Sequence, residues 1–156
     1  MKLNLVAVGN KMPTWVDLAV NEYGRRLPPD FALVVKTVPL AKRSKTSNID
    51  QCVRKEAEAL LARLGRDDVV VALEVKGRVL DTESLARRIN AIREQGRDLS
   101  LLVGGPDGLG EACLARASEQ WSLSALTLPH PLVRILVAEQ LYRVWSLLNQ
   151  HPYHRD

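Results

Sequence analysis

The chain has 156 residues, 46% apolar and 26% charged, which is typical of one globular domain and excludes disordered or collagen-like chains. No apolar run approaches the length of a membrane span or a secretory signal, so we expect a cytosolic protein with no membrane partner. The net charge of +4 permits a phosphate-rich partner without requiring one, and Cys52 and Cys113 form no metal-ligand motif, so we expect no metal.

Apolar patterning predicts strands that alternate with helices along the whole chain. The expected strands are 2–8, 31–38, 68–75 and 98–103, with a strand-like or extended segment at 121–128. The expected helices are 13–27, 48–64, 83–95, 111–118 and 131–150, with caps at Asn48 and at Asp81 or Thr82. The runs VVVAL and LSLLV are continuously apolar, which is typical of a parallel sheet covered on both faces. We therefore expect one α/β domain that binds ligands after Leu73 and Val103, beyond the carboxyl ends of its strands.

A glycine-rich turn, GGPDGLG at 104–110, follows the fourth strand and opens a helix. Glycines permit positive φ and let a ligand approach the backbone closely. The order does not fit a dinucleotide fingerprint, whose third glycine would stand at Cys113, and Pro106 removes one N–H donor. Two interpretations of this segment therefore remain open, a structural turn and a ligand-binding loop.

The next segment is SLSALTLPHPLVR at 122–134, and its only polar side chains before the histidine are small hydroxyls. Such a lining suits a neutral ring such as adenine, held by backbone groups and apolar walls. Pro129 and Pro131 stiffen the peptide around His130. The alternative interpretation is a buried connection with a surface histidine.

Two features mark the C-terminal part of the chain. In the last helix, Glu139, Arg143, Ser146 and Gln150 form one polar stripe on an otherwise apolar surface. So wide an apolar surface indicates burial on more than one side, in a dimer interface or at the centre of a monomer. The tail HPYHRD combines side chains that can stack on a base, pair with phosphate and exchange a proton, although termini are often frayed.

The segments MKLNLVAVGNKMPTWV, LLVGGPDGL, WSLSALTLPHPLVR and NQHPYHRD together resemble the RlmH family across the whole chain. These are small SPOUT-class methyltransferases that modify N3 of a pseudouridine in helix 69 of 23S ribosomal RNA. The resemblance implies a single SPOUT domain over residues 1–156 whose part from about residue 70 onward is tied into a trefoil knot. It also implies a homodimer, S-adenosylmethionine as cofactor, and 23S rRNA in the assembled ribosome, not DNA, as partner.

The resemblance assigns roles to particular residues and favours the ligand loop at the glycine turn. The implied cofactor contacts are Leu73, Gly104, Leu123, Ser124, Ala125, Leu126, Thr127 and Leu128. Our hypothesis is that a second group, comprising His130, Arg143, Tyr153, His154 and Arg155, surrounds the target base. The arginines hold phosphate or a base carbonyl, Tyr153 positions or stacks on the ring, and His154 accepts the N3 proton, with His130 as the alternative acceptor. This chemistry requires no metal.

The basic loop residues Lys42, Arg43 and Lys45 are candidate contacts to the RNA backbone, with a solvated loop as the alternative. Two other classes of protein are considered. A Rossmann oxidoreductase would need a better glycine fingerprint and an acidic residue about 20 positions past it, and 128–132 offers none. A non-catalytic ribosome-binding protein would share the basic loop but would not need the cofactor lining.

Overall fold

Five strands form one parallel sheet in the computed structural model, which describes residues 1–155. The strands are β1 (Lys2–Val8), β2 (Ala32–Val38), β3 (Val69–Val79), β4 (Leu99–Val103) and β5 (Glu119–Ser122), in the spatial order β2-β1-β4-β3-β5. Each neighbouring pair runs parallel. The predicted α/β fold with a parallel sheet is confirmed.

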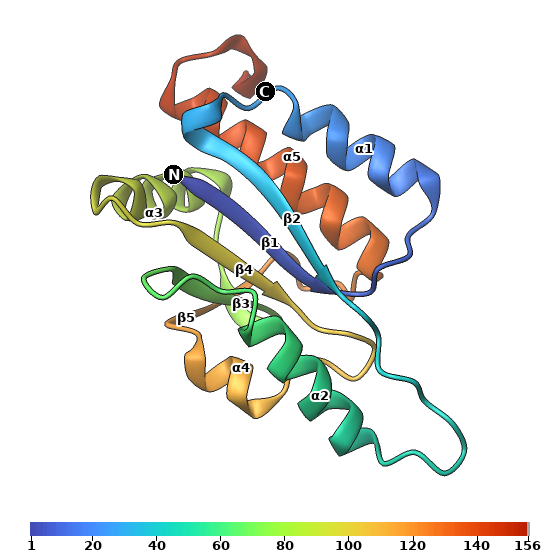
Figure 1. Cartoon of the computed structure of the whole chain (residues 1–156). Coiled ribbons are helices and arrows are strands. Elements are labelled where there is room, and N and C mark those ends of the chain that lie inside the picture. The colour runs from blue at the N-terminus through green and yellow to red at the C-terminus, as the bar shows by residue number, and fades with distance from the viewer. Residues whose placement is uncertain (156) are drawn as a thin grey trace.

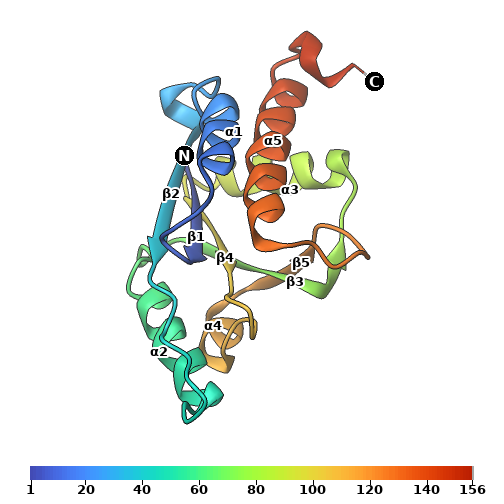
Figure 2. The ribbon, with the colours of Figure 1, turned by 90° about the vertical axis from the view of Figure 1, so that its right-hand side faces the viewer.

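Helices cover both faces of this sheet (Figures 1 and 2). One face carries α1 (Thr14–Gly24), α3 (Thr82–Glu94) and α5 (His130–Leu148), and the other carries α2 (Ile49–Leu61) and α4 (Glu111–Arg116). Short 3-10 helices at Pro29–Phe31 and Pro152–His154 complete the chain. Within residues 1–155, no helix has the length and apolar character that crossing a bilayer requires.

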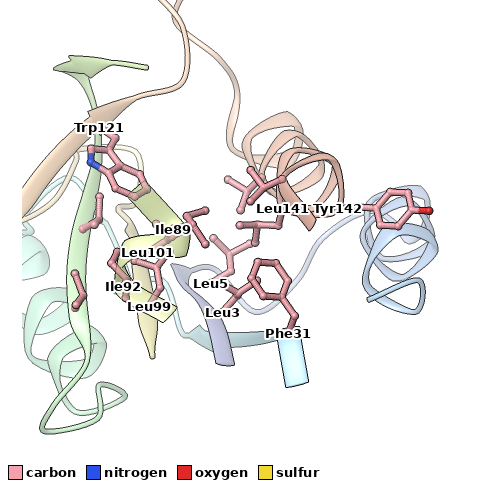
Figure 3. Packing of buried hydrophobic residues seen from close by; sticks show 14 of the residues in the cluster. Leu3, Leu5, Phe31, Ile89, Ile92, Leu99, Leu101, Trp121, Leu141 and Tyr142 are labelled. Atoms are coloured by element: carbon pink, nitrogen blue, oxygen red, sulfur yellow. The ribbon is translucent and has the colours of Figure 1, made fainter. Parts of the chain in front are cut away.

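The alternation of side chains along β1 divides the core between the two faces. Leu3 and Leu5 are fully buried against residues of α3 and α5 (Figure 3), whereas Val6 and Val8 pack with residues of α2 and α4. Successive side chains of a strand point to opposite faces, so a strand that is apolar at almost every position is buried on both sides. Burial of each large side chain contributes about 1.5–3 kcal/mol, and this apolar burial holds the layers together.

The last helix lies in the middle of its face. It contacts both α1 and α3, and Leu141 reaches the main core (Figure 3). The predicted polar stripe on this helix is wrong beyond Arg143. Ser146 is fully buried and its hydroxyl donates to the Tyr142 carbonyl oxygen at 2.9 Å, and Gln150 lies beyond the helix end. Contacts within its own chain therefore bury much of the apolar surface of α5, whereas Leu132 near its start is exposed.

The predicted cap at Asn48 is confirmed, and of the two candidates at the next helix, Asp81 and not Thr82 is the cap. The Asn48 side chain accepts from the Gln51 N–H at 3.3 Å, and the Asp81 carboxylate accepts from the Ser84 N–H at 2.7 Å. Each cap satisfies an N–H group that the first turn of a helix leaves without an intrahelical acceptor. These local bonds fix where α2 and α3 begin.

Two strand boundaries differ from the prediction. Strand β3 continues to Val79, and of the segment 121–128 only its first two residues belong to β5. The pairing of β3 with β5 shifts register between Leu73 and Arg78. Gly77 makes the irregular pairing possible, since a Cβ atom there would lie 2.7 Å from the carbonyl carbon of Trp121. The residues after Ser122 therefore form a loop at the carboxyl edge of the sheet.

Candidate active site

A cavity of about 540 Å³ opens at the carboxyl edge of the sheet. Its walls come from the middle of β3, the glycine turn after β4, and the loop that leads from β5 into α5. The cofactor residues predicted from the sequence that line it are Leu73, Gly104, Leu123, Ser124, Leu126, Thr127 and Leu128. Ala125 is not among the lining residues. The three sequence segments singled out separately thus form one concave site.

The glycine turn is folded tightly on itself. Gly108 has a φ of +81°, and its N–H donates to the Gly105 carbonyl oxygen at 3.0 Å. A Cβ atom on Gly104 would lie 2.5 Å from the carbonyl carbon of Gly108, so no side chain fits there. Yet Gly104, Gly105 and Gly108 also line the cavity. The same glycines therefore form both a tight turn and part of the cavity wall.

The hydroxyls of the loop after β5 are largely occupied within the loop. Ser122 Oγ donates to the Ser124 carbonyl oxygen at 2.9 Å, and Ser124 Oγ accepts from the Leu126 N–H at 3.0 Å. Leu126 itself is 72% exposed. A ligand in the cavity would meet mainly apolar side chains and backbone groups on this side, as the composition of the segment predicts.

Among the lining residues, two carry titratable side chains, Glu74 and His130. Burial raises the pKa of Glu74. Burial and the nearby charge of Arg134 lower the pKa of His130 to about 4, so its imidazole is neutral at physiological pH. The His130 Nε2 atom is buried and has no hydrogen-bond partner within residues 1–155. The sequence signal for Glu74 is its place directly after Leu73 in the same strand.

Arg134 connects the first turns of α5 to the end of β1. It is buried, and its Nη2 donates to the carbonyl oxygens of Gly9 at 2.6 Å and Val8 at 3.3 Å. Removal of the guanidinium from water lowers its pKa. The sequence patterns offered no reason to single out this residue, since its partners are backbone carbonyls far away along the chain. It holds the start of α5, and with it one wall of the cavity, against the sheet.

A second cluster lies at the opposite end of α5. The Tyr153 hydroxyl donates to Glu139 Oε1 at 3.0 Å, and Arg143 Nε donates to the same oxygen at 2.9 Å. The Tyr153 ring lies 4.6 Å from the Tyr142 ring, centroid to centroid, and 5.0 Å from the Arg143 guanidinium. Burial, and then the Glu139 carboxylate, raise the pKa of Tyr153, so the phenol keeps its proton. The tail is packed on α5 through these contacts.

The predicted base-binding residues fall into two places. Arg143 and Tyr153 are in the cluster at the end of α5, His154 and Arg155 follow directly, and His154 Nδ1 contacts the His151 carbonyl oxygen. His130 instead begins α5 and lines the cavity. At 1.5 Å per helical residue, His130 and Arg143 are about 20 Å apart. Figure 1 shows the tail beside the end of α1, away from the carboxyl edge of the sheet. One chain therefore holds the cavity and the tail at separate places.

Comparison with known proteins identifies the fold and the chemistry. The family described as "Predicted SPOUT methyltransferase" matches residues 1–154. The chain belongs to this family. As a member of this family the protein is a methyltransferase, and the alternative of a Rossmann oxidoreductase is wrong.

Relatives of this SPOUT methyltransferase cover its whole length. A protein named "Ribosomal RNA large subunit methyltransferase H" from Marinomonas sp. (strain MWYL1) is 50% identical over 155 residues, which are 99% of this chain and 100% of the relative. A protein of the same name from Hahella chejuensis (strain KCTC 2396) is 51% identical over 156 residues, with full coverage of both chains. The resemblance recognised in the sequence is confirmed.

Two solved structures share the SPOUT fold at low identity. A putative methylase family protein from Neisseria gonorrhoeae superposes with a TM-score of 0.54 and 9% identity, covering 96% of this chain and 93% of that one. A probable methylase family protein from Haemophilus influenzae Rd KW20 superposes with a TM-score of 0.57 and 12% identity, covering 99% of this chain and 70% of that one. At these identities the likeness concerns the fold alone.

Proposed function

We propose that this SPOUT methyltransferase uses S-adenosylmethionine to methylate N3 of a pseudouridine in helix 69 of 23S rRNA, on the assembled ribosome in the cytoplasm. The names of the relatives, at 50% and 51% identity over essentially the whole chain, support ribosomal RNA as the substrate. The observation that carries the proposal is the cavity of about 540 Å³, which unites the glycine turn with the loop after β5. Its volume lies within the range of small-molecule sites.

The chemistry of the cavity lining fits the proposed cofactor. Apolar side chains and backbone groups from 123–128 suit the adenine ring, and the Glu74 carboxylate is the lining group that suits the positive charge of the cofactor. Leu73 and Gly104 complete the set of residues that would hold it. When bound, S-adenosylmethionine supplies an activated methyl group whose transfer leaves a neutral thioether.

The residues of the C-terminal cluster would act on the base. The bound cofactor would supply the methyl group to N3, and the N3 proton would pass to a base on the enzyme. His154 is the proposed acceptor, since a pKa of about 4 makes His130 a weak base. Tyr153, as a protonated phenol, positions the ring, and Arg143 and Arg155 bind phosphate or a base carbonyl.

A second copy of the chain would bring a tail to each cavity. Within one chain the two parts are separated along α5 by about 20 Å, so a partner subunit would complete the proposed site. Large apolar side chains are exposed beside the cavity, at Leu126 and Leu132, and on α1, at Trp15 and Leu18. These observations support a homodimer whose sites combine residues of both subunits. The trefoil knot, from about residue 70 onward, is part of the same proposal.

The decisive experiment is methyl transfer from labelled S-adenosylmethionine to ribosomes that lack the modification. We expect the label in the large ribosomal subunit, at N3 of a single pseudouridine, with much less transfer to naked 23S rRNA. Label at another nucleotide would refute the assignment of the target. Calorimetry with S-adenosylmethionine separates the enzyme from a non-catalytic ribosome-binding protein, because a protein that binds no cofactor cannot be this methyltransferase.

A further inference from the structure

The loop between β2 and α2 carries three basic residues, but they do not point the same way. Lys42 and Lys45 are exposed, whereas the Arg43 side chain is only 19% exposed. Its Nη1 donates to the Ala41 carbonyl oxygen at 2.9 Å and to Glu56 Oε1 at 2.6 Å. Arg43 is thus turned toward the protein, in contrast to its expected role as an RNA contact.

Glu56 makes Arg43 an integral part of the fold. This carboxylate on α2 is 2% exposed and also accepts from the Ala41 N–H at 3.0 Å. A buried carboxylate is tolerated only when a cation and hydrogen-bond donors compensate for its lost hydration. The loop is therefore fixed to α2 by two donors on one carboxylate.

The other edge of the Arg43 guanidinium reaches the glycine turn. Arg43 Nε donates to Asp107 Oδ2 at 2.9 Å, across 64 positions of sequence. The turn also packs against Glu56 directly, since a Cβ atom on Gly105 would lie 3.1 Å from Glu56 Oε2. Arg43 and Glu56 together hold the turn, whose residues Gly104, Gly105 and Gly108 also line the cavity.

We propose that Arg43 is a positioning residue of the cofactor site, which holds the glycine turn in its binding conformation through Asp107. A glycine-rich turn loses more conformational freedom on becoming ordered than other backbone does. A ligand that must order such a turn binds more weakly than one that meets a turn already fixed. The planar guanidinium, with donors on two edges, can serve Glu56 and Asp107 at once, which the single ammonium of a lysine cannot. The inference rests on the proposed cofactor function of the cavity.

The charges in this cluster also argue against Arg43 as the phosphate contact. Its single positive charge is shared between the carboxylates of Glu56 and Asp107, so the three groups carry a net negative charge. A phosphate would have to displace Asp107 to bind there. The remaining candidates for a phosphate contact are Lys42 and Lys45, which are exposed on the same loop.

The test measures the affinity for S-adenosylmethionine in four variants. Asp107→Asn weakens the link to the turn, because the amide can accept from Arg43 but carries no charge, and it leaves the buried Arg43–Glu56 pair intact, so the protein should still fold. We expect its affinity for S-adenosylmethionine, measured by calorimetry, to fall about fivefold, as for a partly exposed ion pair. Asp107→Glu should restore most of this loss, because it keeps the carboxylate. Arg43→Lys should lose cofactor affinity by a similar factor, and the double variant Arg43→Lys/Asp107→Asn should lose little more than either single one.

Two further measurements distinguish positioning from other roles. Amide hydrogen exchange in the turn should speed up in Asp107→Asn without a change elsewhere, whereas a general loss of stability would affect the whole chain. The matched control Lys42→Gln/Lys45→Gln should leave cofactor affinity unchanged. If the wild type binds the cofactor and Asp107→Asn binds it equally well, the inference is overturned. A wild type that binds no cofactor would refute the proposed function instead, and with it the role assigned to Arg43.

Discussion

The hydroxyl of Tyr153 donates to Oε1 of Glu139 at 3.0 Å, which connects the C-terminal tail to the helix 14 residues before it. The same carboxylate oxygen accepts from Arg143, and the Glu139 side chain is 16% exposed. Glu139 therefore sets the positions of two of the residues proposed to meet the base. The bond also contributes to the raised pKa of Tyr153.

Replacement of Glu139 with Gln should test this arrangement. The amide can still accept from Tyr153 but carries no negative charge to oppose ionisation of the phenol, so we expect the pKa of Tyr153 to fall toward its usual value. Methyl transfer should fall about tenfold while cofactor affinity stays constant, because the cavity is at the other end of α5. Tyrosine titration followed by ultraviolet absorbance, with Tyr153→Phe as reference, measures the pKa. An unaltered titration would show that burial alone raises it.

His154→Ala should reduce the rate of methyl transfer and spare cofactor binding. Loss of a general base typically costs about 100-fold or more. Single-turnover kinetics on ribosomes, together with calorimetry for S-adenosylmethionine, separates the two effects. An unchanged single-turnover rate removes His154 from the mechanism.

Mixing two inactive variants tests whether the site is shared between subunits. Thr127→Trp fills the cavity and leaves the tail intact, whereas His154→Ala does the reverse. If each site combines the cavity of one subunit with the tail of the other, a heterodimer contains one intact site. Equal amounts of the two variants that are mixed, unfolded together and then refolded should restore about a quarter of the wild-type activity. If both parts of a site came from the same chain, the mixture would stay as inactive as its components.

The depressed pKa of His130 predicts a dependence of stability on pH. In the folded protein the imidazole stays neutral until about pH 4, whereas in the unfolded chain it takes up a proton near its usual pKa of 6.5. Acid therefore favours the unfolded chain in this window, and the free energy of unfolding should fall by up to about 3 kcal/mol as the pH drops from 6.5 to 4. Urea unfolding of the cofactor-free protein measures this loss. His130→Gln should show a flatter profile there and match the wild type only at neutral pH.

Neutralising Lys42 and Lys45 should weaken ribosome binding without affecting the cofactor. Every lysine that pairs with a phosphate adds to the salt dependence of binding, so without these two charges the slope of log affinity against log salt should decrease by about one to two units. Exchange of Arg66, which is also exposed, for Gln is the control. Equal affinities and slopes for the double variant and the wild type would show that these lysines do not contact RNA and that the loop is a solvated surface.

Local patterns in the sequence determined the elements of this fold. Apolar patterning predicted four of the strands, and capping residues at Asn48 and at Asp81 or Thr82 predicted the starts of two helices, because these signals depend on neighbours within a few residues. The segments that form the cavity were also predictable, since the carboxyl ends of parallel strands meet at one edge of a sheet.

Only the tertiary structure decided which distant groups meet. The register shift of β3 against β5 brings Gly77 close to Trp121, and the guanidinium of Arg43 pairs with Glu56 and Asp107. The separation of His130 from the tail follows from the length of α5, which spans the face of the sheet from one edge to the other. Periodicity is a local property, whereas the partner of a buried charge depends on the path of the whole chain. The sequence by itself therefore identified the candidate functional side chains, whereas the fold determined which of them lie together.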